Sequence, residues 1–162
     1  MRLSDIQLTE SNYFVAMEYY GLILNRTFLV ILTESHLIGM VSNGLVNTRV
    51  APDPWTAMLT NGFSVQGNLY NKNTYISEKQ LKRLSSIDLL SNDFLKLDRA
   101  NFRISYADIS EVFYDPHKNW WIFCRPCDGK IYLSTPDKKR AFFILGNQSG
   151  LDISRRITQK IG

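Results

Sequence analysis

Cysteine and histidine are scarce in this chain of 162 residues, which contains two of each. Two cysteines cannot build the disulfide framework of a small secreted domain. The N-terminal residues also lack the apolar segment of a secretory signal. We therefore expect a cytoplasmic protein.

Long apolar runs are missing too. The most apolar stretch, residues 13–41, is interrupted by Glu18, Asn25-Arg26, Glu34 and His36. A membrane-spanning helix needs about 20 consecutive apolar residues. No transmembrane segment is therefore expected.

Several motifs of nucleotide binding and nucleophilic catalysis are absent. The sequence has no Walker phosphate loop, no Gly-x-Gly-x-x-Gly and no Gly-x-Ser-x-Gly. We expect no cofactor, and catalysis is not the leading interpretation.

The charge balance is uneven along the chain. Residues 71–162 contain 16 Lys and Arg against 10 Asp and Glu, whereas residues 1–70 contain 3 against 5. A basic half can indicate binding to nucleic acid or to an anionic membrane surface. Because the basic residues are interspersed with acids, nucleic-acid binding is not expected, whereas peripheral membrane contact stays open. The one basic run, Lys138-Lys139-Arg140, follows Pro136-Asp137 and predicts a solvated turn.

Apolar runs and alternating patterns predict several short strands. Residues 28–33 and 36–42, joined by a polar turn, are typical of an antiparallel hairpin. Residues 13–24 fit either a strand or a helix. Further strands are predicted at residues 102–106, 111–114, 130–134 and 140–145.

Two helices are predicted. Ser77-Glu78-Lys79-Gln80 has the form of a capping box and starts a helix over residues 78–90. The second is predicted after Ser149, because Ser149-Gly150-Leu151-Asp152 resembles a capping box with Asp in place of Glu. Ile153, Ile157 and Ile161 lie on one face of this helix. Residues 43–75 are rich in turn-forming Asn, Gly and Pro, which predicts irregular structure.

The order of these elements predicts a mainly β fold of the α+β class. Strands grouped by short turns favour an antiparallel sheet or barrel. We expect a partly open barrel whose open end is capped by the C-terminal amphipathic helix.

Short patterns in this order resemble the bacterial pleckstrin-homology-like domains, relatives of the PH and GRAM domains. The matching residues are Leu32-Thr33, Leu37-Ile38, Ile104-x-Tyr106-x-Asp108-Ile109-x-x-Val112, Gly129-Lys130-Ile131-x-Leu133 and Phe142-Phe143-Ile144-Leu145. The resemblance implies a single domain over residues 1–162, with about seven strands, a capping helix and no catalysis. Residues 45–100 have no counterpart and form a helix-containing insertion of unassigned role.

The resemblance suggests a non-catalytic interaction module that binds a protein or a second copy of itself. Eukaryotic members of this fold bind lipid headgroups through a basic loop between the first two strands. The turn that corresponds to it, Thr33-Glu34-Ser35-His36, is acidic or neutral. No phosphoinositide site is therefore expected.

The segment 116–129 carries the candidate site residues and is predicted to be a long hairpin loop. Trp120 and Trp121, beside Arg125, could form an exposed contact for a protein or a membrane interface, or could fold back onto the barrel.

The same loop contains Cys124-Arg125-Pro126-Cys127, which leaves an alternative function open. The two cysteines could exchange a disulfide, or could bind a metal ion with His117 and His36. The loop context favours cysteines that are simply half-buried.

Overall fold

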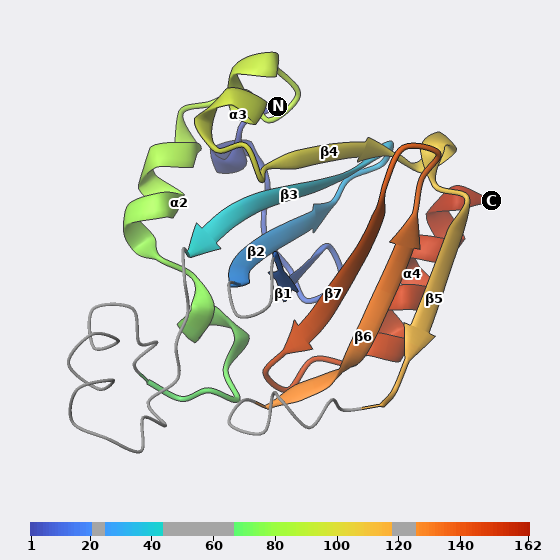
Figure 1. Cartoon of the computed structure of the whole chain (residues 1–162). Helices are drawn as coiled ribbons and strands as arrows, with labels where there is room; N and C mark the ends of the chain where they lie inside the picture. The colour runs from blue at the N-terminus through green and yellow to red at the C-terminus, as the bar shows by residue number, and fades with distance from the viewer. Residues whose placement is uncertain (21–24, 44–66, 118–125) are drawn as a thin grey trace.

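The computed structural model describes residues 1–20, 25–43, 67–117 and 126–162. Within them, seven strands form one antiparallel sheet in the order β4-β3-β2-β1-β7-β6-β5, which curls into a partly open barrel (Figure 1). The strands are β1 (Tyr13–Tyr19), β2 (Asn25–Leu32), β3 (His36–Asn43), β4 (Phe102–Ser105), β5 (Glu111–Asp115), β6 (Cys127–Ser134) and β7 (Lys139–Leu145). The predicted fold class is confirmed, and residues 13–19 form a strand.

Pairing between β1 and β7 joins the two halves of the sheet. Ala16 lies opposite Ile144, and Met17 lies opposite Phe143. As a result β4 and β5, which are consecutive in the sequence, lie on opposite edges of the sheet and are linked by the short helix η4 (Tyr106–Asp108). The predicted hairpin of residues 28–42 is present, with Leu32 opposite Leu37.

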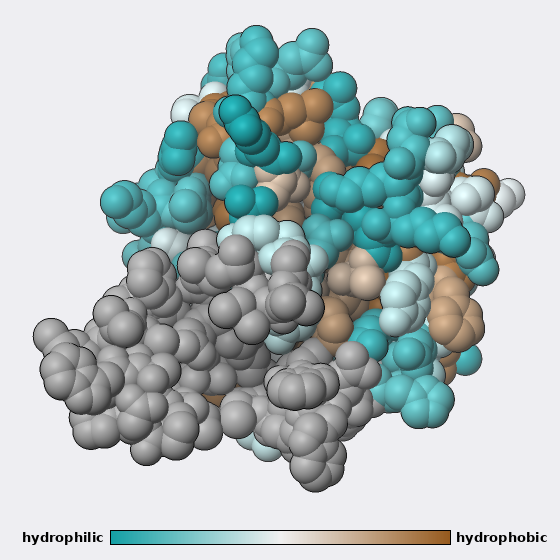
Figure 2. Space-filling model, in the orientation of Figure 1, coloured by the Kyte–Doolittle hydropathy of each residue, from teal (hydrophilic) through white to brown (hydrophobic). Residues whose placement is uncertain are grey.

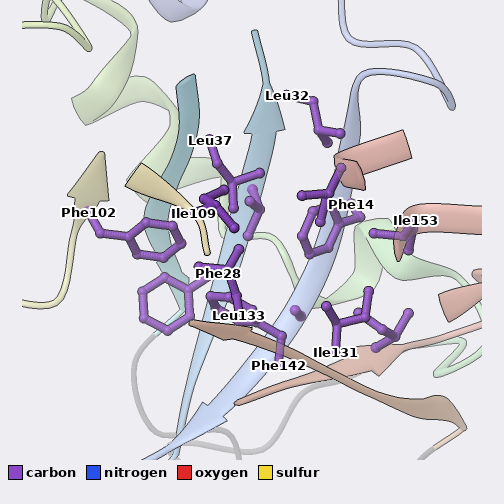
Figure 3. Packing of buried hydrophobic residues seen from close by; sticks show 14 of the residues in the cluster. Phe14, Phe28, Leu32, Leu37, Phe102, Ile109, Ile131, Leu133, Phe142 and Ile153 are labelled. Carbon is purple, nitrogen blue, oxygen red and sulfur yellow. The ribbon is translucent and has the colours of Figure 1, made fainter. Parts of the chain in front are cut away.

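The concave face of the sheet encloses an inner core that is rich in aromatic rings (Figure 3). Side chains at alternate positions of each strand point into it, as a pleated strand requires. Its buried members include Phe14, Phe28, Phe102, Phe142, Ile131, Leu133, Ile153 and Ile157.

The convex face carries a second core, the outer core, which residues 67–100 cover. Val15, Leu29 and Met40 from the sheet pack there with Tyr75, Leu84, Leu89 and Phe94 of residues 67–100. Strands buried on both faces need apolar side chains at every position. This explains why β2 has a continuous apolar run instead of an alternating pattern.

The helices between β3 and β4 differ from the prediction. A helix over residues 78–90 was expected, but α2 (Glu78–Ser85) ends earlier and α3 (Asn92–Leu97) follows it. Between them the backbone N–H of Leu89 bonds to the carbonyl of Met1, and Leu89 is fully buried. This long-range contact competes with continuation of the helix. Ser77 also makes no side-chain capping bond, so the predicted capping box is wrong.

The C-terminal helix α4 (Gly150–Ile161) lies against β5 and β6 (Figure 1). The Ser149 hydroxyl accepts a bond from the backbone N–H of Asp152, as the sequence predicted. Ile153 and Ile157 are buried in the inner core. Within the described ranges, no helix is both long and apolar enough to cross a membrane.

The turn at Thr33–His36 was expected to join the first two strands. Because residues 13–19 form a strand that precedes it, this turn joins the second and third strands, β2 and β3. The segment between β1 and β2 includes residues outside the described ranges, so the expectation about a headgroup site stays a prediction.

Candidate functional site

The sequence-predicted contact residues Trp120, Trp121 and Arg125, together with Cys124, lie outside the described residues. The interpretations based on them stay predictions. Two other residues of that segment, His117 and Cys127, are described.

His117 is exposed, and its hydrogen bonds within the described ranges go to Asp115. Its Nδ1 lies 2.7 Å from the Asp115 carboxylate, and its backbone N–H donates to the same oxygen. These bonds hold the pKa of Asp115 below its usual value. Cys127 begins β6 and packs, half-buried, against the outer core. Over the described ranges, no three His, Cys, Asp or Glu side chains come close enough to hold a metal ion.

We expect the double substitution Cys124→Ser and Cys127→Ser to leave folding nearly intact. Cys127 lies at the margin of the outer core, so little buried apolar surface is lost. The melting temperature should fall by less than about 4 °C, which corresponds to about 1 kcal/mol in a domain of this size. Thermal melts and metal analysis of both proteins check this. Unfolding, or loss of a bound metal from the double variant, would contradict it.

A basic cleft of about 330 Å³ lies where segments from four parts of the chain meet. They are the end of β1, the start of β2, the residues just before β4 and the start of β7. Five cationic side chains and one carboxylate are among the lining residues: Arg26, Arg99, Lys138, Lys139, Arg140 and Glu18. We call this the basic cleft.

The deep part of the basic cleft is an ion pair above an aromatic layer. Arg140 Nη1 donates to Glu18 Oε2 at 2.7 Å, and both side chains are largely buried. The Arg140 guanidinium also lies 4.0 Å from the ring centre of Phe102. That ring packs against Phe28 and Phe142 of the inner core, with centroids 5.6 Å away in each case. The pair thus closes the inner core on this side.

Burial and the neighbouring charges shift the pKa values of Glu18 and Arg140 in opposite directions. Burial raises the pKa of the Glu18 carboxyl, while the nearby cations, Arg140 first, act to lower it. Burial lowers the pKa of Arg140, and Glu18 opposes that shift. An arginine keeps its proton in proteins, so Arg140 neutralises Glu18 when the carboxyl is ionised.

The outer part of the basic cleft keeps its positive charge. Arg26 faces Glu18 across the β1–β2 pair, and its guanidinium lies 4.2 Å from the ring centre of Tyr20. Arg99 and Lys138 are exposed. In the described chain, none of these three cations forms an ion pair. A concave site lined by several cations without ion-pair partners attracts anionic groups.

The β6–β7 turn sets the position of the lysines. Thr135 closes the turn by bonding through its N–H and its hydroxyl to the carbonyl of Lys138, at 2.9 Å in each case. The predicted solvated turn is confirmed for Lys138 and Lys139, which are exposed, but wrong for Arg140, which is buried. Alternation in β7 turns Arg140 inward with Phe142, and this pattern in the sequence could have identified it.

Another cleft, of about 320 Å³, is lined mostly by amide side chains, and its cation is already paired with a carboxylate. Its cation Lys72 donates to Glu10 at 2.6 Å and lies over the ring of Tyr13. Gln148 in the same cleft bonds the backbone of Val15 through both its amide nitrogen and its oxygen. These groups hold the fold together, so the basic cleft is the stronger candidate.

Comparison of the chain with family models, curated proteins and solved structures finds no match. Function is therefore inferred from the residues and the geometry of the basic cleft.

Proposed function

We propose that this chain is a non-catalytic interaction module with a pleckstrin-homology-like barrel, which binds an acidic segment of a protein partner in the basic cleft. The observation that carries the proposal is the surplus of positive charge in a concave site: five cations surround one carboxylate, and that carboxylate is paired with Arg140.

The architecture supports this kind of module. A curled sheet of seven strands with a C-terminal helix over its inner core is what the resemblance implies. The basic cleft lies beside the β6–β7 turn and the ends of β1 and β2, where exposed polar side chains can vary without disturbing the core. On the face drawn in Figure 2, hydrophilic surface extends over β4 and the β6–β7 turn.

The arginines favour a carboxylate-bearing peptide. A planar guanidinium can hold a carboxylate through two parallel hydrogen bonds, which a lysine cannot do. The Arg26 guanidinium is held against Tyr20, which reduces the conformational freedom that binding would otherwise remove. Arg99 and Lys138 can then contact a second acidic side chain of the same segment.

The proposal is tested by fluorescence anisotropy with a labelled peptide rich in Asp and Glu. We expect binding that weakens as salt rises, because exposed charge pairs are screened. The double substitution Arg26→Glu and Lys138→Glu should weaken binding at least tenfold. The matched control is the double substitution Lys79→Glu and Lys82→Glu on α2, two exposed lysines outside the basic cleft, which should change the affinity less than twofold.

Two outcomes would overturn the proposal. The first is equal weakening by the cleft variant and by the α2 double variant, which would indicate a non-specific effect of net charge. The second is binding to phosphatidylserine vesicles, lost in the cleft variant, without any binding to the acidic peptide. That result would assign the basic cleft to a membrane surface instead of a protein.

A further inference from the structure

The outer face of β5, β6 and β7 exposes a pair of stacked aromatic rings. Phe113 on β5 is 55% exposed and Tyr132 on β6 is 37% exposed. Their ring centres lie 6.2 Å apart with an angle of 28° between the rings. Neither ring belongs to the two cores. In Figure 2 the apolar surface over β5 is visible beside paler surface over β6.

The strand register arranges this face as rows that cross the three strands. In one row Phe113 lies opposite Tyr132, which lies opposite Ala141. In the next row Glu111 lies opposite Ser134, which lies opposite Lys139. Directly opposed residues share a face of the sheet. We call these two rows the β5–β7 patch.

The β5–β7 patch has opposite charges on its two sides. Glu111 stands on β5, Lys139 stands on β7, and both are exposed. Neighbouring strands are about 4.8 Å apart, so the two backbones are separated by about 10 Å. In the described part of the chain neither side chain forms an ion pair. Glu111 accepts only a long bond, 3.4 Å, from the Ser134 hydroxyl.

We infer that the β5–β7 patch binds a second copy of this chain, face to face, about a two-fold axis parallel to β6. Such an axis places β5 of each copy over β7 of the other. Interfaces of this type are self-complementary, so every contact occurs twice. Sheets pack in this manner with their strands within about 30° of each other.

Charge and size both fit this axis. Glu111 of each copy faces Lys139 of the other, which gives two ion pairs that the single chain lacks. The large Phe113 faces the small Ala141, and the two Tyr132 rings meet at the axis. Aromatic rings at the centre with charges at the edge are the arrangement in which interface energy concentrates.

Other two-fold arrangements of this surface are disfavoured. A two-fold axis perpendicular to the strands, through the row of Phe113, places Glu111 of one copy over Asp115 of the other. Antiparallel pairing of two β5 edges, centred on Phe113, sets the same two carboxylates directly opposite each other. Like charges in opposed positions destabilise such pairs. The charge pattern therefore selects the axis parallel to β6.

Sedimentation velocity of the full chain at about 1 µM to 1 mM, without any acidic peptide, tests this inference, with the range chosen to cover weak association. We expect a reversible dimer. Phe113→Ser should weaken it at least tenfold, and so should Glu111→Lys or Lys139→Glu, because each single reversal opposes like charges. The combined variant Glu111→Lys with Lys139→Glu should restore association to within about threefold of the parent protein.

Rescue by the double reversal separates a direct contact from a general effect on folding, and thermal melts confirm that each variant is folded. A chain that stays monomeric at 1 mM would overturn the inference. So would a dimer that the single reversals leave unchanged, since its contacts would lie elsewhere. If Lys139→Glu is unstable, Phe113→Ser and Glu111→Lys alone decide the question. Phe113 and Glu111 do not line the basic cleft, so the effects of Phe113→Ser and Glu111→Lys on association are independent of the proposed peptide binding.

Discussion

The substitution Ile157→Asp should destabilise the protein by about 4 kcal/mol or more, because it removes a buried apolar side chain and buries an unpaired charge. Ile157 is fully buried on α4, among the apolar side chains of the inner core. In a domain of this size the melting temperature should fall by about 10 °C or more. Circular dichroism melts of the two proteins measure it.

The matched control is Leu151→Asp on the same helix. Leu151 is exposed, and an acidic residue in the first turn of a helix is favourable. Its substitution should shift the melting temperature by about 2 °C or less. If Ile157→Asp shifts it equally little, α4 does not close the barrel, and its isoleucine face is available to another molecule.

The substitution Arg140→Met should cost about 3 kcal/mol, since removal of one partner of a buried ion pair leaves the other charge without compensation. The Glu18 side chain is only 19% exposed and would lose its bond to the guanidinium. The contact between Arg140 and the ring of Phe102 would be lost as well. Denaturant unfolding at pH 7 measures the difference.

A second substitution distinguishes the charge effect from simple loss of packing. Adding Glu18→Met to Arg140→Met should recover most of the stability, because a buried pair is often replaced by apolar residues at little cost. A double variant no more stable than Arg140→Met alone would mean that packing dominates.

The pH dependence gives an independent check. Burial already raises the pKa of Glu18, and Arg140 is the main group that opposes the shift. Without Arg140 the pKa of Glu18 rises further above its unfolded value. A carboxyl whose pKa is higher in the folded than in the unfolded protein adds to the free energy of unfolding at low pH. This contribution is lost as the pH rises through the pKa of the folded state. The deficit of Arg140→Met should therefore be smaller at pH 4.5 than at pH 7.

Local patterns in the sequence located the strands well and the helices between β3 and β4 less well. Apart from residues 13–24, which fitted either a strand or a helix, each predicted strand has ends within three residues of an observed strand. Alternation in half-buried strands and a continuous apolar run in β2 made them recognisable. The helix predicted over residues 78–90 ended early, since a contact between Leu89 and Met1, 88 residues apart, decides where the chain turns. Periodicity within a short window contains no information about such a contact.

The basic cleft was largely hidden from sequence analysis. The basic run Lys138-Lys139-Arg140 by itself predicts a turn and indicates no cleft. Arg26 and Arg99 stand 73 residues apart and carry no motif. They line one cleft with Lys138 only because β1 pairs with β7 and brings the first strands to the last ones.

The sequence by itself determined the class of the fold, the positions of most strands and the buried face of α4, since these depend on hydrophobic periodicity within each element. The tertiary structure decided which strands are neighbours, which face of the sheet residues 67–100 cover and which charges meet. These outcomes depend on the packing of side chains between elements far apart in the chain. That packing places β4 and β5 on opposite edges, buries Arg140 beside Glu18 and leaves Phe113 and Tyr132 exposed.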